Sequence, residues 1–233
     1  QRVNVEGTIN LLERCRIHTV PKFIFASSSS VYGGRTQVPF RETDNIMHPI
    51  SPYAATKVAG EALCHTYHHL FGINIFALRF LTVYGQRQRP EMAIHLFANH
   101  ILRGEPLPIF GNGKSPRDYT YIDDIVRGIV GSIEKCEGYN VLNLGGSNTT
   151  PLDELVQIIG ERLEISPCIQ HSPDQTGDVP ITYADISSAK TLLGYQPQVD
   201  IREGIDRFCS WLEQQRPSKM WEETVGTESI PPR

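Results

Sequence analysis

Apolar residues recur along the first part of the chain with two different spacings. Between residues 3 and 18 they fall at helical spacing, with Val5, Ile9 and Leu12 among them. Residues 22–33, KFIFASSSSVYG, begin as a short β-rich run and then break into four serines. The two patterns predict a helix, a strand and a polar loop, in that order.

A second helix and a second strand follow with clear boundaries. The segment from residue 51 to residue 72 has Pro52 near its first turn and Gly72 at its end, which are ordinary helix start and stop signals. Residues 73–85 are almost continuously apolar, a pattern typical of a parallel strand covered on both faces. This alternation predicts an α/β fold with a doubly wound parallel sheet.

The pattern of long helices and strands ends after Gly85, where prolines divide the chain into shorter helices and extended pieces. These pieces predict a smaller C-terminal α/β lobe that is built from non-contiguous segments. We therefore expect three parts, which are a doubly wound domain at 1–85, a region at 86–213 that forms mainly the lobe and partly returns to the sheet, and a polar tail at 214–233.

Composition narrows the class of protein. Lys and Arg number 22 against 26 Asp and Glu, and the net charge of −4 argues against a nucleic-acid partner. No apolar run reaches the ~20 residues that span a bilayer, so we expect a cytoplasmic protein without a membrane partner. The cysteines have no short metal-binding spacing, and we expect isolated buried thiols and no metal site. The five are Cys15, Cys64, Cys136, Cys168 and Cys209.

The start of the second predicted helix carries candidate acid/base chemistry. A tyrosine is a poor base at neutral pH because its unperturbed pKa is about 10. Lys57 follows Tyr53 by four residues, so it lies on the same helix face, and its charge favours a phenolate. The pair is a candidate general acid and base. The spacing also arises by chance, and the alternative is a packed tyrosine beside an exposed lysine.

The serines after the first strand add to this chemistry. Ligands of open α/β sheets bind at the carboxyl ends of the strands, which is where Ser28 lies. A hydroxyl there could hydrogen-bond the same substrate hydroxyl that Tyr53 would deprotonate. For Ser27 we expect only a polar exit from the strand.

With these motifs the sequence resembles the extended short-chain dehydrogenases/reductases that act on nucleotide sugars. FASSSSVYG, SPYAATK, LRFLTVYG and RDYTYIDDIV occur in that family's order and at its spacings, from residue 2 to about residue 213. The resemblance implies a Rossmann-like domain that binds NAD, with a nucleotide sugar as the substrate. It also implies a reaction in which a sugar carbon is oxidised, the keto-sugar rotates, and reduction from its other face inverts the carbon.

The resemblance assigns roles to single residues. It implies that Ser28, Tyr53 and Lys57 form a catalytic triad and that Lys57 also holds the nicotinamide ribose. Tyr53 would take the proton of the sugar hydroxyl while a hydride passes to NAD. Asn4 and Phe80 match family positions that lie near the cofactor.

The residues after Ser28 separate the chemistries of this family. Dehydratase relatives have Asp-Glu there, and relatives that decarboxylate UDP-glucuronate have a glutamate in the second place. This chain has Ser29 and Ser30, which favours epimerisation. Thr82 and the loop after it resemble those of the UDP-glucuronate 4-epimerases, whereas galactose-type 4-epimerases have Asn at the position of Thr82. By this resemblance Ser29, Ser30 and Thr82 would hold the sugar carboxylate of a UDP-sugar.

Three further residues complete the substrate site that the resemblance implies. Arg89 and Arg117 are candidates for the diphosphate, because a guanidinium can hydrogen-bond phosphate oxygens with two N–H groups. The alternative for each arginine is a solvated surface position. Asp178 would hold a ribose hydroxyl, and Gln175, where galactose-type epimerases have arginine, agrees with a glucuronate-type site.

The sequence lacks the strand and the G-x-x-G-x-x-G turn that bind a dinucleotide pyrophosphate. Judged against the family, we expect several βα units, about 90 to 100 residues, upstream of Gln1. One hypothesis is the catalytic portion of an NAD-dependent 4-epimerase, with UDP-glucuronate favoured and UDP-glucose or UDP-galactose as the alternative. The other is a non-catalytic fragment that binds a nucleotide sugar or dimerises.

The helices that begin near Val3 and Pro52 also suggest a partner. Both carry apolar stripes that one flank of the sheet does not obviously cover, and this family pairs the two helices across a two-fold axis into a four-helix bundle. We therefore expect a homodimer. The stripe residues are Val5, Ile9, Leu12, Val58 and Ala62.

Overall fold

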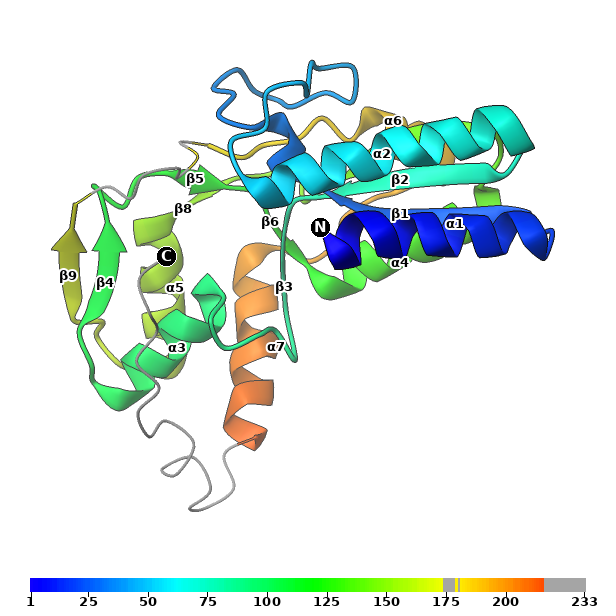
Figure 1. Cartoon of the computed structure of the whole chain (residues 1–233). Helices are drawn as coiled ribbons and strands as arrows, with labels where there is room; N and C mark the ends of the chain where they lie inside the picture. The colour runs from blue at the N-terminus through cyan, green and yellow to red at the C-terminus, as the bar shows by residue number, and fades with distance from the viewer. Residues whose placement is uncertain (174–178, 180, 216–233) are drawn as a thin grey trace.

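The centre of the fold is a three-stranded parallel sheet in the order β1-β2-β7 (Figure 1). The structure is a computed structural model and describes residues 1–173, 179 and 181–215. A parallel sheet with helices between its strands confirms the predicted α/β class. The strands are β1 (Lys22–Ser28), β2 (Asn74–Phe80) and β7 (Tyr139–Leu144).

Helices cover both faces of this sheet. One face carries α1 (Gly7–Ile17) and α2 (Pro52–Phe71), and the other carries α4 (Ile122–Lys135) and α6 (Ser187–Leu193). Successive side chains of a strand point to opposite faces, so β2 contributes side chains to two hydrophobic cores, one on each face of the sheet. Ile75 and Ala77 pack with α1 and α2, whereas Phe76 and Leu78 pack with α4 and α6. This explains why the β2 sequence is apolar throughout rather than alternating.

The first helix differs from its prediction at the start. Residues Arg2–Glu6 form a π-helix, in which the Glu6 amide donates to the Gln1 carbonyl at 3.4 Å. The wider π turn shifts Val5 relative to the faces of the following α-helix, so Val5 does not continue the stripe of α1 at ordinary helical spacing. Leu12, which we expected on an uncovered stripe, is fully buried in the core of α1, β1 and α2. Leu11 is the exposed leucine instead.

The predicted strand at 73–85 is wrong as a single element. β2 ends at Phe80, and after Leu81 the chain forms a separate strand, β3 (Thr82–Tyr84), which pairs in parallel with β6 (Tyr119–Tyr121). The Leu81 amide still donates to the Leu144 carbonyl of β7 at 3.1 Å. The Thr82 amide turns away and donates to the Asp118 carbonyl at 3.1 Å. The chain therefore leaves the sheet within one residue.

A second core lies in the smaller lobe, on the left of Figure 1. The apolar faces of its helices pack together with one face of a two-stranded parallel sheet. Two short strands, β5 (Pro116–Arg117) and β8 (Thr150–Pro151), pair antiparallel. The division of the chain at residue 85 stays a prediction. The lobe consists of α3 (Ala93–Arg103), β4 (Leu107–Phe110), α5 (Leu152–Leu163), β9 (Ile169–Ser172) and α7 (Ile201–Gln214).

The cysteine prediction holds for only part of the set. All five thiols are free, and Cys64, Cys136 and Cys209 are buried. Cys168 is exposed, because it lies in the loop that leads into the short strand β9 rather than in a core. In the part of the chain that the structure describes, no helix has the length and apolar character needed to cross a bilayer.

Candidate active site

The start of helix α2 is fixed by its own sequence. The Ser51 hydroxyl accepts a hydrogen bond from the Ala54 amide at 3.1 Å and caps the helix, and Pro52 occupies the first turn. Gly72 ends the helix in the left-handed conformation, with φ 69°. These boundaries place Tyr53 in the first turn of α2 and Lys57 one turn later.

Lys57 joins the helix to the end of strand β1. Its ammonium donates to the Ala26 carbonyl at 2.8 Å and lies 5.6 Å from the centre of the Tyr53 ring. Partial burial lowers the pKa of the Lys57 ammonium. The Tyr53 side chain is half exposed, so its phenol is open to a ligand. Lys57 therefore contacts β1 two residues before Ser28, with the Tyr53 ring beside it.

Ser28 ends β1 and caps the 3₁₀ helix η2 (Ser29–Tyr32). Its hydroxyl accepts a hydrogen bond from the Ser30 amide at 3.2 Å and donates to the Ser30 hydroxyl at 3.0 Å. Ser29 and Ser30 are both half-buried in η2. The structure therefore gathers the three predicted serines in one turn at the carboxyl end of β1.

The two further residues expected near the cofactor, Asn4 and Phe80, contact α2 and β1 respectively. The Asn4 amide donates to the Thr56 hydroxyl at 3.0 Å, and that hydroxyl donates to the Tyr53 carbonyl at 2.7 Å. Phe80 is the register partner of Ser28 on the neighbouring strand and is half-buried against the α4 side of the sheet. Asn4 thus lies beside the first turn of α2, and Phe80 lies beside Ser28.

A cavity of about 360 Å³ opens between β3, α3 and β4, and Thr82 and Arg117 line it. Its other polar lining is Glu91, Ser115 and Tyr119, and its remaining walls are apolar. A mainly apolar hollow with a few placed polar groups is typical of a small-molecule site. The apolar lining residues are Ala93, Leu96, Phe97, Pro108, Phe110 and Leu152.

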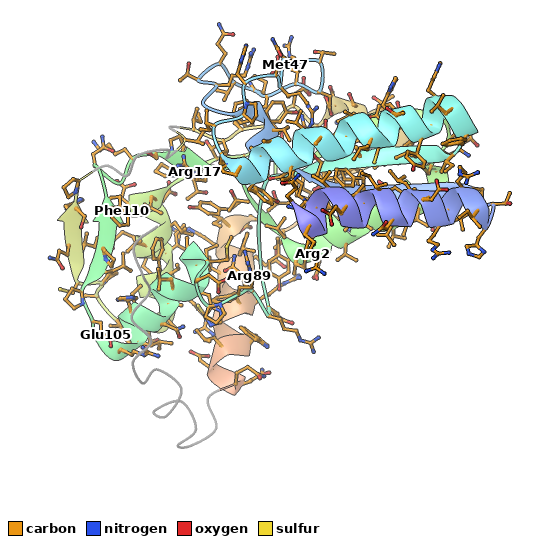
Figure 2. All side chains as sticks on the ribbon, viewed as in Figure 1. Arg2, Met47, Arg89, Glu105, Phe110 and Arg117 are labelled. Carbon is orange, nitrogen blue, oxygen red and sulfur yellow. The ribbon has the colours of Figure 1, made fainter. Side chains whose placement is uncertain are left out.

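The two predicted arginines differ in their surroundings. Arg117 lines the cavity, whereas Arg89 is absent from its lining and lies 3.3 Å from the Glu91 carboxylate, with 74% of its side chain exposed. Figure 2 labels both arginines in the region between the sheet and the smaller lobe. Asp178 and Gln175 lie outside the described residues.

The sequence reasoning missed Asp118, which is fully buried beside Arg117. One carboxylate oxygen, Oδ1, accepts hydrogen bonds from the Gly146 amide at 2.7 Å and the Thr120 hydroxyl at 3.1 Å. The other, Oδ2, accepts none from the residues that the structure describes. Burial raises the pKa of Asp118 to about 6, and the hydrogen bonds oppose this rise only in part. The signal in the sequence was a lone acid between two short β runs, RDYTY.

The comparisons with known proteins agree with this architecture. The profile of the NAD dependent epimerase/dehydratase family matches residues 1–145, which is more than half of the chain. The chain therefore belongs to this family. Over 209 residues it is 45% identical to an uncharacterized protein of Methanocaldococcus jannaschii, with 90% of this chain and 64% of that protein covered.

Named relatives and solved structures refine the comparison. The UDP-glucuronate 4-epimerase of Thermodesulfobacterium geofontis is 41% identical over 212 residues, which cover 91% of this chain and 65% of that enzyme. The chain thus spans slightly less than two thirds of the length of these two relatives.

Two solved structures have the same fold as the chain. The UDP-glucuronic acid 4-epimerase of Bacillus cereus, in complex with UDP-glucuronic acid and NAD, matches with a TM-score of 0.85 and 38% identity, covering 91% of this chain and 68% of that one. The UDP-glucose 4-epimerase of Thermotoga maritima with UDP-glucose matches with a TM-score of 0.88 and 33% identity, covering 92% and 70%. These matches confirm the predicted Rossmann-like fold.

Asp118 gives a prediction about stability and pH. Its pKa is raised in the folded chain, so the folded state binds the proton more tightly than the unfolded state does. Stability therefore falls as the pH rises from about 4 to about 6.5, by about 3 kcal/mol in total for a pKa that rises from 3.8 to about 6. Denaturant unfolding across this range should show that loss in the wild type and not in Asp118→Asn. Parallel pH profiles of the two proteins would contradict this account of Asp118.

Proposed function

We propose that the protein containing this chain is an NAD-dependent nucleotide-sugar 4-epimerase and that UDP-glucuronate is its substrate. The observation that carries the proposal is the placement of Tyr53 and Lys57 against the end of the strand that carries Ser28. A mainly apolar cavity with Arg117 and Thr82 in its wall supports the nucleotide-sugar part. The named relatives support the same reaction.

The side chains at the start of α2 suit the nicotinamide ribose of NAD. An ammonium and a phenol can both hydrogen-bond ribose hydroxyls, and Lys57 and Tyr53 present these groups side by side. Asn4 and Phe80 would border the same part of the cofactor. NAD, when bound there, accepts and returns a hydride at the reacting carbon of the sugar.

In this proposal Tyr53 moves the proton. Its phenolate takes the proton from the hydroxyl on C4 of the sugar and later returns it to the C4 oxygen, when the hydride returns to C4 from the other face. Lys57 favours the phenolate, because a positive charge one helical turn away stabilises a negative one. The bond from Lys57 to the Ala26 carbonyl keeps that charge close to the end of β1.

Ser28 would share the developing charge on the sugar oxygen. In the structure its proton points to the Ser30 hydroxyl, so it must turn toward a substrate oxygen when one binds. A hydroxyl proton rotates readily, whereas the Ser30 amide keeps the Ser28 oxygen in place. Ser28 therefore acts as a hydrogen-bond donor whose oxygen is already positioned.

The hydroxyls of Ser29, Ser30 and Thr82 would hold the C6 carboxylate of glucuronate. Arg117 and Arg89 would bind the diphosphate. Asp178 would hydrogen-bond a hydroxyl of the ribose. The apolar walls around Phe97 and Phe110 suit a flat base. A UDP-glucose 4-epimerase is the second candidate, and the likeness to the Thermotoga maritima enzyme favours it. A non-catalytic module that binds a nucleotide sugar is the alternative of a different class.

We also propose that the protein forms a homodimer through α1 and α2. Several large apolar side chains on these helices, and Val3 in the π-helix before α1, remain exposed although each helix is packed on the sheet. Exposed apolar patches of this kind mark protein interfaces. The residues are Val3, Ile9, Leu11, Ile17, Leu70 and Phe71.

The first prediction concerns the proton. In the complete protein containing this chain, Tyr53→Phe should lower the epimerisation rate at least ~100-fold, because a positioned acid and base is lost. Ser28→Ala should cost less, since Tyr53 still acts. Tyr67→Phe on the same helix removes a hydroxyl that bonds Glu13 and should leave the rate unchanged. Turnover of Tyr53→Phe within a few-fold of wild type would refute the triad.

The second prediction concerns the sugar. Thr82→Val keeps the shape of the side chain and removes one donor. For UDP-glucuronate, kcat/KM should therefore fall by an amount that corresponds to a loss of about 1 to 3 kcal/mol of transition-state stabilisation. The effect on UDP-glucose, which has no carboxylate, should be much smaller. Thr66→Val, which alters an exposed hydroxyl on α2, is the control. A wild type that prefers UDP-glucose, or equal damage to both substrates, favours the second candidate.

The third prediction concerns assembly. Leu11→Glu places a charge on the exposed face of α1 and should convert the dimer to a monomer, as measured by light scattering at micromolar concentration. Leu192→Glu changes another exposed leucine, on α6 and on the other face of the sheet, and should leave the dimer intact. A monomeric wild type would contradict the proposed interface.

A further inference from the structure

A buried ion pair lies beneath the candidate active site. Glu61 of α2 and Arg79 of β2 expose only 6% and 3% of their side chains. The guanidinium donates from Nε to one carboxylate oxygen at 2.9 Å and from Nη2 to the other at 2.7 Å. This two-point geometry fixes the position and the orientation of both groups.

Two further bonds of the pair go to residues that border the site. The Ser27 hydroxyl donates to the Glu61 carboxylate at 2.5 Å, and Ser27 is the residue before Ser28. Arg79 Nη1 donates to the Tyr32 hydroxyl at 3.0 Å, and Tyr32 ends the 3₁₀ helix that holds Ser29 and Ser30. The pair therefore touches the strand before Ser28 and the turn after it.

The network continues across the sheet. The Tyr32 hydroxyl donates to Oδ1 of Asn143, on β7, at 2.6 Å. The Asn143 amide groups in turn bind Glu42 and the carbonyls of Phe40 and Asp185. Helix α2, all three strands and the loop at residue 40 are thus joined through one set of buried polar groups.

The charges of this pair are well supported. Burial alone would lower the pKa of the Arg79 guanidinium, but its hydrogen bonds to Glu61 and Tyr32 raise it above the ordinary value. Burial raises the pKa of Tyr32 to about 12, so its hydroxyl keeps its proton and can donate to Asn143. Arg79 therefore stays a cation, and Tyr32 stays a neutral donor.

We propose that the Glu61–Arg79 pair is a positioning device that sets Ser28 and the η2 serines against Tyr53 and Lys57. Glu61 follows Lys57 by one helical turn, so the carboxylate fixes both the rotation of α2 and its height along β1. The hydroxyls of Ser27 and Tyr32 fix the two ends of the segment that carries Ser28. Neither Glu61 nor Arg79 needs to touch a substrate. The inference rests on the proposed function.

Stability alone is a weak explanation for such a pair. Removing two charges from water is costly, and apolar residues of similar volume often replace a buried ion pair without loss of stability. An apolar pair would fill the space but could not hold Ser27 and Tyr32 by hydrogen bonds. Catalysis is sensitive to this, since a displacement of about 1 Å in a reacting group can cost about 100-fold in rate.

The decisive variant is therefore Glu61→Leu/Arg79→Met in the complete protein. It should remain folded, with a melting temperature within about 5 °C of wild type, because no unpaired charge is left. Its kcat should fall at least ~10-fold, with KM changed less than about 3-fold, because geometry is lost and binding is not. The exposed pair Glu161–Arg202, replaced by Leu and Met in the same way, should change neither value.

A second readout does not depend on turnover. Amide hydrogen exchange in residues 28–32 should be at least ~10-fold faster in the double variant than in wild type or in the control. If the wild type epimerises no UDP-sugar, the proposed function fails while exchange still tests the pair. Wild-type kcat together with wild-type exchange in the folded double variant would overturn the inference.

Ser27→Ala covers the case in which the double variant does not fold. It removes one hydrogen bond to Glu61 and leaves the ion pair in place. It should lower kcat about 3-fold or more and speed exchange in residues 28–32, with little change in melting temperature. Ser27→Ala with unchanged kcat and unchanged exchange would overturn the inference as well.

Discussion

The structure depends on how closely helix α2 lies against strand β1. Three successive residues of the strand each meet a residue within one turn and a half of the helix. The pairs are Phe25 with Gly60, Ala26 with Lys57 and Ser27 with Glu61. A Cβ at Gly60 would overlap the Phe25 ring, so only glycine permits this approach. Packing, a charge and a hydrogen bond therefore fix the same register between helix and strand, and this register places Lys57, with Tyr53 one turn earlier, near the end of β1.

The second constraint is the turn of the chain at Leu81. Phe80 still belongs to the sheet and lies beside Ser28, whereas Thr82 already pairs with Tyr119 and lines the cavity. One residue thus separates the half of the site that suits a cofactor from the half that suits a substrate. The Asp118 carbonyl holds the turn, and the buried carboxylate of the same residue binds the Gly146 amide. Asp118 therefore hydrogen-bonds both the segment after β7, at Gly146, and the start of β3, at Thr82.

Features that depend on local physics could be read from the sequence, and features that depend on distant partners could not. Pro52 and Gly72 predicted the two ends of α2, and the apolar run predicted the strand β2. The break at Leu81 was hidden, because both sides of it are apolar and the turn is set by residues more than 30 positions away. The burial of Leu12 was also hidden, because the residues that cover it belong to β1, β2 and α2. Arg79, a charged residue inside an apolar run, led to no prediction, because its partner Glu61 on α2 is defined only by the fold.

The candidate site combines positively charged side chains with neutral hydroxyls. Lys57 lies at the end of β1 and Arg117 lines the cavity, while Ser28, Ser30 and Thr82 supply neutral groups. In the proposed reaction the diphosphate must stay bound while the oxidised sugar turns over. A hydrogen bond to a charged partner contributes about 1.5 to 3 kcal/mol, and a neutral pair contributes about 1 kcal/mol. Strong bonds would thus anchor the nucleotide, and several weaker ones would let the sugar exchange its contacts as it turns. A fixed charge at Ser29 or Thr82 would slow that exchange, so the absence of an acid or base after Ser28 suits epimerisation rather than elimination.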